Sequence, residues 1–218
     1  MIDITSQLDA AHRAVASRPG ADGADGASIG VVLRRAYDAP IADVWHALTE
    51  PERVQRWFLP LHGDLRAGGN FQLEGNAGGE ILECAAPRLL RVTFGDPTSR
   101  LELRLAPDGP RGTVLAFEHT VPLAMAGSGA GALYVGPGWD GALMSLDLYL
   151  RGEVSDDPVA AANTPEAQEF SRRSIDAWAA VVAASGTASP DEIAAATTVS
   201  LQQFAPDLAA TPQAGGDA

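Results

Sequence analysis

The chain has 218 residues, 46% apolar and 6% aromatic, and carries a net charge of -13 from 28 acidic and 15 basic residues. This length suits one domain with extensions or two small domains. The acidic balance argues against a nucleic acid partner, which needs clustered Lys and Arg, and against an anionic membrane surface. No apolar run reaches about eighteen residues, so no membrane span is expected.

Targeting and metal signals are also missing from the sequence. The first residues, MIDITSQLDAAHRAV, have neither a basic region nor an apolar stretch typical of export, so we expect a cytoplasmic protein. Cys84 is the single cysteine, which excludes an intrachain disulfide and a cysteine-based zinc site within one chain. No two histidines have ligand spacing with a carboxylate, so we expect no metal and no cofactor.

The N-terminal part of the chain predicts short elements. An apolar face predicts a helix over residues 3–18, and the Gly- and Asp-rich segment 18–28 has the composition of a linker. Near alternation of apolar residues predicts a strand over 28–37. Two short helices are then expected over 41–50 and 52–58, the first opened by a proline.

The middle of the chain has the pattern of an antiparallel meander. Apolar and polar residues alternate in successive short runs up to Pro122, and the joints GNAGG, GDPTS and APDGPRG are rich in hairpin residues. Sustained alternation at this spacing predicts a sheet with one buried face and one wet face.

The segment GPGWDGALMSLDLYL, residues 136–150, predicts a long helix that extends to about Glu153. Trp139 and Leu143 belong to an apolar stripe, but Met144 lies on another side, so the helix is apolar over much of its surface. A sheet with one apolar face must be covered. We therefore predict an α+β fold in which a curved antiparallel sheet wraps around this helix, one side of which lines any remaining space.

Five spaced blocks carry a family resemblance. The chain resembles the SRPBCC superfamily, START-like proteins with a helix-grip fold, in the bacterial branch similar to the activator of the 90-kilodalton heat-shock chaperone ATPase. The blocks are P-x-x-x-V-W-x-A-L-T-x-P-x-x-x-x-x-W-F (40–58), D-L-R-x-G-G-x-F (64–71), G-E-I-L-E (79–83), P-R-L-L (87–90) and G-W-x-x-x-L-x-x-L (138–146).

The resemblance implies a domain organisation and a cavity between the long helix and the sheet. A helix-grip domain is expected over 28–154, after an N-terminal helical extension and linker over 1–27. A C-terminal helical extension over 155–206, with helices at about 165–184 and 190–205, and a flexible tail over 207–218 would follow. The resemblance implies no single reaction, because superfamily members bind lipids, hormones or polyketides, and some catalyse cyclisation or hydrolysis.

Several apolar residues are candidates for ligand contact. Trp57 and Phe58 either close one end of the fold or form a cavity rim, since aromatic walls are typical of small-molecule pockets. The other candidates fall on predicted inward faces, where some serve as plain core and some would touch a ligand: Phe71, Leu73, Phe94, Leu103, Phe117, Trp139 and Leu143.

Three polar residues are open to more than one interpretation. His119 shares parity with Leu115 and Phe117, so it should point inward, either as a hydrogen-bonded core residue or as a group that orients a ligand or transfers a proton. Asp147 faces either solvent or the cavity. Asp140 is expected in the first turn of its helix, where a carboxylate suits the helix dipole.

The leading hypothesis is a protein that binds a small apolar or amphipathic molecule between helix and sheet. One alternative is an enzyme of cyclase or hydrolase type that uses the same cavity, with His119 as the motivating residue. Another is an interaction protein associated with a chaperone or with stress response, which an exposed apolar patch would favour. A homodimer is left open.

Overall fold

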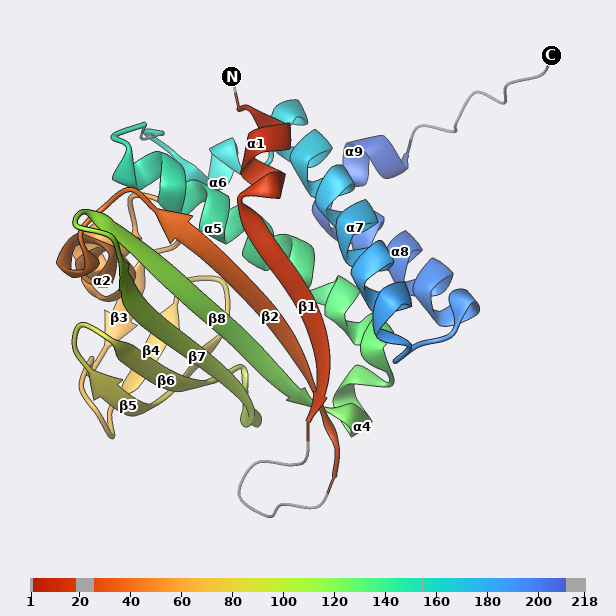
Figure 1. Cartoon of the computed structure of the whole chain (residues 1–218), viewed down its shortest axis with the longest axis horizontal. Helices are drawn as coiled ribbons and strands as arrows, with labels where there is room; N and C mark the ends of the chain where they lie inside the picture. The colour runs from red at the N-terminus through yellow and green to blue at the C-terminus, as the bar shows by residue number, and fades with distance from the viewer. Residues whose placement is uncertain (1, 19–25, 154, 211–218) are drawn as a thin grey trace.

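The computed structural model describes residues 2–18, 26–153 and 155–210. Its strands form one antiparallel sheet of eight, in the order β1-β2-β8-β7-β6-β5-β4-β3, and helices cover one side of it (Figure 1). The strands are β1 (Ala11–Arg18), β2 (Ser28–Tyr37), β3 (Leu61–Gly63), β4 (Asn70–Leu73), β5 (Gly78–Ala85), β6 (Leu89–Phe94), β7 (Asp96–Asp108) and β8 (Gly112–Pro122).

The long helix α5 packs against β2, α2 and α7, which confirms the predicted α+β helix-grip architecture. None of the helices among the described residues is long and apolar enough to cross a lipid bilayer. The helices are α1 (Ile4–Asp9), α2 (Ile41–Thr49), α3 (Pro51–Val54), α4 (Leu123–Ala126), η2 (Gly129–Tyr134, a 3₁₀ helix), α5 (Gly136–Leu150), α6 (Pro158–Ala161), α7 (Pro165–Ser185), α8 (Pro190–Phe204) and α9 (Pro206–Ala209).

The helix predicted over residues 3–18 is wrong in its second half. Only α1 is helical there, and β1 pairs with β2 in continuous register from Ala11 opposite Arg35 to Arg18 opposite Ser28. Spacing alone fitted a helix, but the free edge of β2 presents unpaired backbone groups that a neighbouring strand satisfies. The short strand β3 was not predicted either. Most of the expected linker, residues 19–25, lies outside the described residues.

The predicted inward faces of the central strands form the core. Val31 and Leu33 on β2 and Leu115 and Phe117 on β8 are each at most 3% exposed, and Leu146 on α5 is fully buried. These side chains belong to one apolar cluster that continues into α2 and α7. Burial of each stabilises the fold by roughly 1.5–3 kcal/mol.

The two predicted C-terminal helices are confirmed by α7 and α8. Thr164 and Ser189 cap their N-termini through side-chain oxygens that accept backbone N–H bonds, and Gly186 ends α7 in the left-handed region. Phe170 and Trp178 are buried on the inner face of α7. Residues 207–209, predicted as part of a flexible tail, lie in α9, whereas 211–218 are outside the described residues.

A buried carboxylate joins three elements that are distant in sequence. One oxygen of Asp140 on α5, Oδ2, accepts bonds from Arg13 Nε on β1 at 2.7 Å, from Ser174 Oγ at 2.5 Å and from Trp178 Nε1 at 3.0 Å, the last two on α7. Asp140 is the fifth residue of its helix rather than part of the first turn, so its role is this ion pair rather than the predicted dipole interaction.

Replacing this carboxylate should destabilise the fold strongly. We expect Asp140→Asn to lower the free energy of unfolding by about 3–5 kcal/mol, because Arg13 is then buried without a counter-charge. The exposed Asp176 on α7 is the control, and Asp176→Asn should change stability by less than about 1 kcal/mol. Urea denaturation measures both, and equal small losses would show that the pair does not hold these elements together.

Candidate functional site

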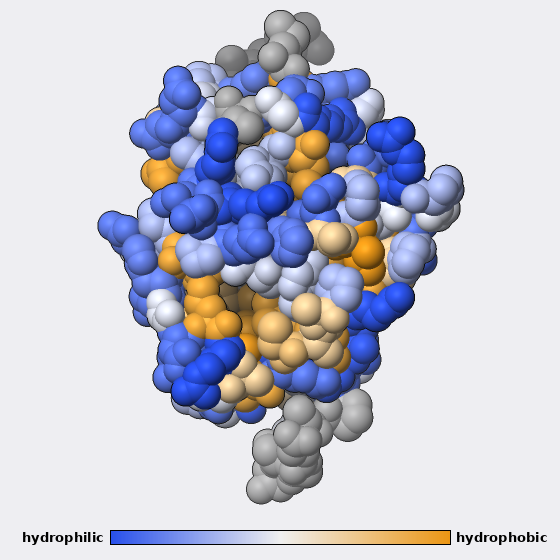
Figure 2. All heavy atoms as spheres, turned by 90° about the vertical axis from the view of Figure 1, so that its left-hand side faces the viewer, coloured by the Kyte–Doolittle hydropathy of each residue, from blue (hydrophilic) through white to orange (hydrophobic). Residues whose placement is uncertain are grey.

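A cavity of about 160 Å³ lies between α5 and the sheet. Strands β3 to β8 supply most of its wall, α5 supplies Trp139, Ala142 and Leu143, and the chain from Leu48 to Phe58 closes another side. The face of the molecule seen in Figure 2 is hollowed, and apolar side chains rim the hollow. Space therefore remains where the sequence predicted it, between the helix and the strands.

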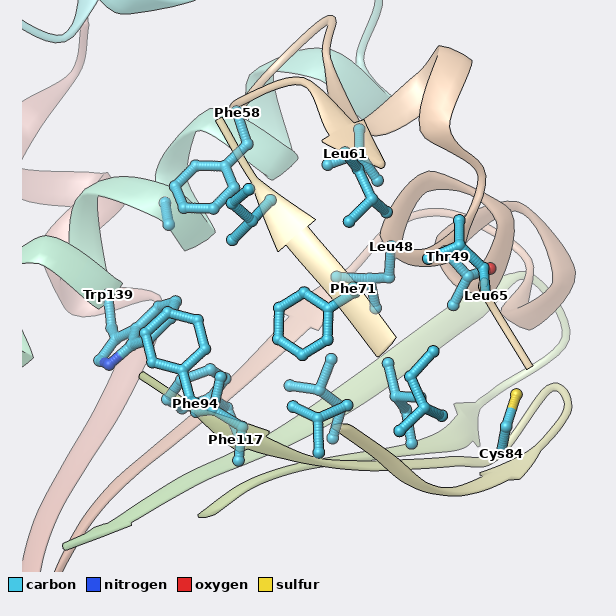
Figure 3. A pocket seen from close by; sticks show the side chains of 18 of the residues that line it. Leu48, Thr49, Phe58, Leu61, Leu65, Phe71, Cys84, Phe94, Phe117 and Trp139 are labelled. Carbon is cyan, nitrogen blue, oxygen red and sulfur yellow. The ribbon is translucent and has the colours of Figure 1, made fainter. Parts of the chain in front are cut away.

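Most of the predicted site residues are brought together in this wall, and Figure 3 shows several of their side chains directed into the cavity. Nine of the eleven candidates line it: Trp57, Phe58, Phe71, Leu73, Phe94, Leu103, Phe117, Trp139 and Leu143. His119 and Asp147 do not.

Sequence reasoning missed the other lining residues for two reasons. Leu90, Val92 and Leu101 share strand parity with candidates that were named, so the same pattern could have found them. Thr49 and Cys84 carried no such signal, because the end of a helix meets the end of a strand only in the folded chain. The full set of missed residues is Leu48, Thr49, Val54, Leu61, Leu65, Ile81, Cys84, Leu90, Val92, Leu101 and Ala142.

None of the described residues that line the cavity is charged. Its three side-chain N–H and O–H groups already have acceptors in the protein. Trp57 Nε1 donates to Ala47 O at 2.9 Å, Thr49 Oγ1 to Trp45 O at 2.8 Å and Trp139 Nε1 to His119 Nδ1 at 3.1 Å. The wall therefore offers mainly apolar contact, and none of its N–H or O–H donors is free for a ligand.

Aromatic rings gather at one end of the cavity. The Trp139 ring lies 4.7 Å from that of Phe117 and 5.2 Å from that of Phe94, and Phe71 lies 6.4 Å from Phe94, all measured between centroids. Thr49, Leu65 and Cys84 lie toward the opposite end in Figure 3. The cavity thus has an aromatic end and an end with small polar atoms.

His119 packs against the rings at the aromatic end of the cavity without lining the cavity. It points inward from β8 as predicted, is 4% exposed, and packs edge-on against the rings of Phe94 and Trp139. Since the indole N–H can only donate, Nδ1 is the acceptor for Trp139. The proton of the neutral ring is then on Nε2, which donates to Ser99 Oγ at 2.8 Å.

This arrangement does not suit acid or base catalysis in the cavity. The tautomer set by Trp139 leaves His119 with no free nitrogen to accept a proton from Ser99, and neither ring nitrogen faces the cavity. Burial lowers the pKa of His119 to about 4, which keeps the ring neutral at neutral pH. The enzyme hypothesis loses the residue that motivated it.

Asp147 lies on a different side of α5 and does not reach the cavity. Its Oδ2 accepts from Gln7 Nε2 at 2.8 Å and pairs with Arg35 NH2 at 3.2 Å and Arg151 NH2 at 3.0 Å. The carboxylate thereby holds α1 and β2 against α5, and the idea that it orients a ligand in this cavity is wrong. It borders instead a separate polar depression near the β7–β8 hairpin.

No group of three His, Cys, Asp or Glu side chains within residues 2–18, 26–153 and 155–210 is arranged to hold a metal ion. Cys84 is exposed, and the ring nitrogens of His119 bond to Ser99 and Trp139 rather than to this thiol.

Acid should destabilise the protein through His119. Its folded-state pKa of about 4 lies below the ordinary value of 6.5, so the unfolded chain binds this proton first and stability falls as pH drops through that window. Between about pH 7 and pH 5 the wild type should lose about 2 kcal/mol more unfolding free energy than His119→Gln. Urea melts at both pH values measure this, and parallel losses would contradict the assignment.

Comparison with known proteins places the chain in a family. The model described as "Activator of Hsp90 ATPase homolog 1-like protein" matches residues 38–151, more than half of the chain. The crystal structure of CalU16 from Micromonospora echinospora is 39% identical, with 79% of this chain and 98% of that chain covered and a TM-score of 0.65.

A solution structure of CalU16 gives 38% identity, coverage of 80% and 96%, and a TM-score of 0.66. The protein EF2215 from Enterococcus faecalis shares the fold at 17% identity, with coverage of 82% and 95% and a TM-score of 0.57. A search of curated proteins finds no match. On the family model and the CalU16 similarity, the chain belongs to the family of activator of Hsp90 ATPase homolog 1-like proteins, within the SRPBCC superfamily.

Proposed function

We propose that this protein binds a small apolar molecule in the cavity between α5 and the sheet. The observation that carries the proposal is the lining, where twenty residues surround about 160 Å³ and none of them is charged. Small-molecule sites are concave, largely preformed and lined mainly by apolar and aromatic side chains. The family supports the same function, because its members often bind hydrophobic ligands.

Affinity would come from burial of ligand carbon. Each Å² of apolar surface removed from water contributes roughly 25 cal/mol before the entropic costs of association. The wall is also held rigidly, since Trp57 and Trp139 are fixed by hydrogen bonds on their far sides. A preformed wall lowers the ordering cost of binding.

A chaperone-associated interaction is the alternative suggested by the family. Such a partner needs an exposed apolar surface. The large apolar side chains that are exposed in the described chain lie on six different elements, so no one helix or strand presents a continuous apolar face. They are Leu82, Met125, Tyr134, Val159, Val199 and Leu208. This distribution favours the cavity as the functional site.

Filling the cavity should weaken binding strongly. Ala142 lines the cavity, whereas a Cβ at the neighbouring Gly141 would meet nothing within 4 Å. We expect the wild type to bind the apolar fluorophore N-phenyl-1-naphthylamine, Ala142→Phe to bind it at least about tenfold more weakly, and Gly141→Phe to bind it like the wild type. Fluorescence titration gives the affinities, and thermal melts show that both variants fold.

Unchanged binding by a folded Ala142→Phe would contradict the proposal, as would the absence of binding by the wild type. Native mass spectrometry of the purified protein complements the titration. An extra mass that is lost on denaturation, carried by the wild type and Gly141→Phe but not by Ala142→Phe, would identify the molecule that occupies the cavity.

A further inference from the structure

We propose that the molecule bound in the cavity is uncharged and enters with an aromatic ring system first. The inference rests on the proposed function and adds the class of ligand. Two features of the wall carry it: all three of its side-chain N–H and O–H donors are engaged, and its aromatic rings gather at one end.

The hydrogen bonds already made around the cavity argue against a charged ligand. Three lining side chains carry N–H or O–H donors, and Trp57, Thr49 and Trp139 each donate to an acceptor outside the cavity. No described lining residue supplies a charge. An anion or cation inside would lose its hydration without gaining a partner, which is a large penalty.

The aromatic end of the cavity suits a flat ring system. Trp139, Phe94 and Phe117 form a tight group there, with centroid distances of 4.7 and 5.2 Å from the indole, and Phe71 lies between this group and the opposite end (Figure 3). Aromatic rings prefer offset or edge contacts at such distances, so a ligand ring gains more here than an alkyl chain of equal area.

The opposite end is where a small polar substituent of the ligand would remain. Cys84 lines the cavity and is also exposed, so the cavity reaches solvent there. The Thr49 hydroxyl donates to Trp45 O, which leaves its lone pairs able to accept a bond from a ligand hydroxyl. A neutral hydroxyl fits this end, and a ring fits the other.

Two pairs of matched probes test whether the cavity prefers an uncharged molecule. N-phenyl-1-naphthylamine and 8-anilinonaphthalene-1-sulfonate share one skeleton and differ by the sulfonate. The neutral probe should bind wild-type protein at least about tenfold more tightly than the sulfonate does. Methyl 1-naphthoate should displace it at least about tenfold better than 1-naphthoate does, which controls for the bulk of the sulfonate.

Two further measurements test the orientation. Phe94→Leu should weaken binding of the neutral probe at least about threefold, because the aromatic contact is lost. The affinity for 1-decanol, measured by displacement of the probe, should change by less than about twofold. Saturation with the neutral probe should also slow the reaction of Cys84, the single thiol, with a soluble disulfide reagent. An equal loss of affinity for the probe and for the alcohol would overturn the proposal that the ring system binds at the aromatic end.

The outcomes separate this inference from the proposed function. If charged and neutral probes bind equally and Ala142→Phe blocks both, the cavity is a binding site and the inference on charge is wrong. If a folded Ala142→Phe binds both probes like the wild type, the cavity is not the site and both proposals fail. Should Ala142→Phe fail to fold, Leu103→Trp fills the same cavity from β7, with Leu82→Trp on the outer surface of β5 as its control.

Discussion

The position of α5 is the constraint on which the rest of the structure depends, and two buried carboxylates set it. Asp140 and Asp147 are seven residues apart, about two helical turns, so they project from similar sides of the helix. One pairs with Arg13 on β1 and the other with Arg35 on β2. A buried ion pair tolerates little displacement, because separation leaves an uncompensated charge in a medium of low dielectric constant.

This arrangement explains why the helix is apolar over so much of its surface. Asp140 and Asp147 are held by ion pairs to β1 and β2, and α7 packs on the same helix, while Trp139, Ala142 and Leu143 contribute both to the core and to the cavity wall. The N- and C-terminal elements therefore act on the cavity without lining it. They hold α5 on the side that faces away from the cavity, and the space between helix and strands remains open.

Strand parity and helix spacing predicted the central fold and the apolar wall, because both depend on which face of an element is buried. Phe94 and Leu103 were placed in this way. Parity does not identify the neighbour on that face, and for this reason His119 was placed inward correctly but not recognised as the acceptor for Trp139. The spacing of residues 11–18 fitted a helix, and the pairing of this segment with the edge of β2 could not be read from it.

Polar residues buried near an apolar cavity invite a catalytic interpretation, but their partners decide whether it holds. His119 accepts from Trp139 and donates to Ser99, so both of its nitrogens have partners within the protein. If it instead took part in chemistry, one nitrogen would have to reach the cavity, and the indole that defines the aromatic end would lose its acceptor. The same bond that engages Nδ1 of His119 orients Trp139, and a fixed ring lowers the ordering cost of the ligand binding that we propose.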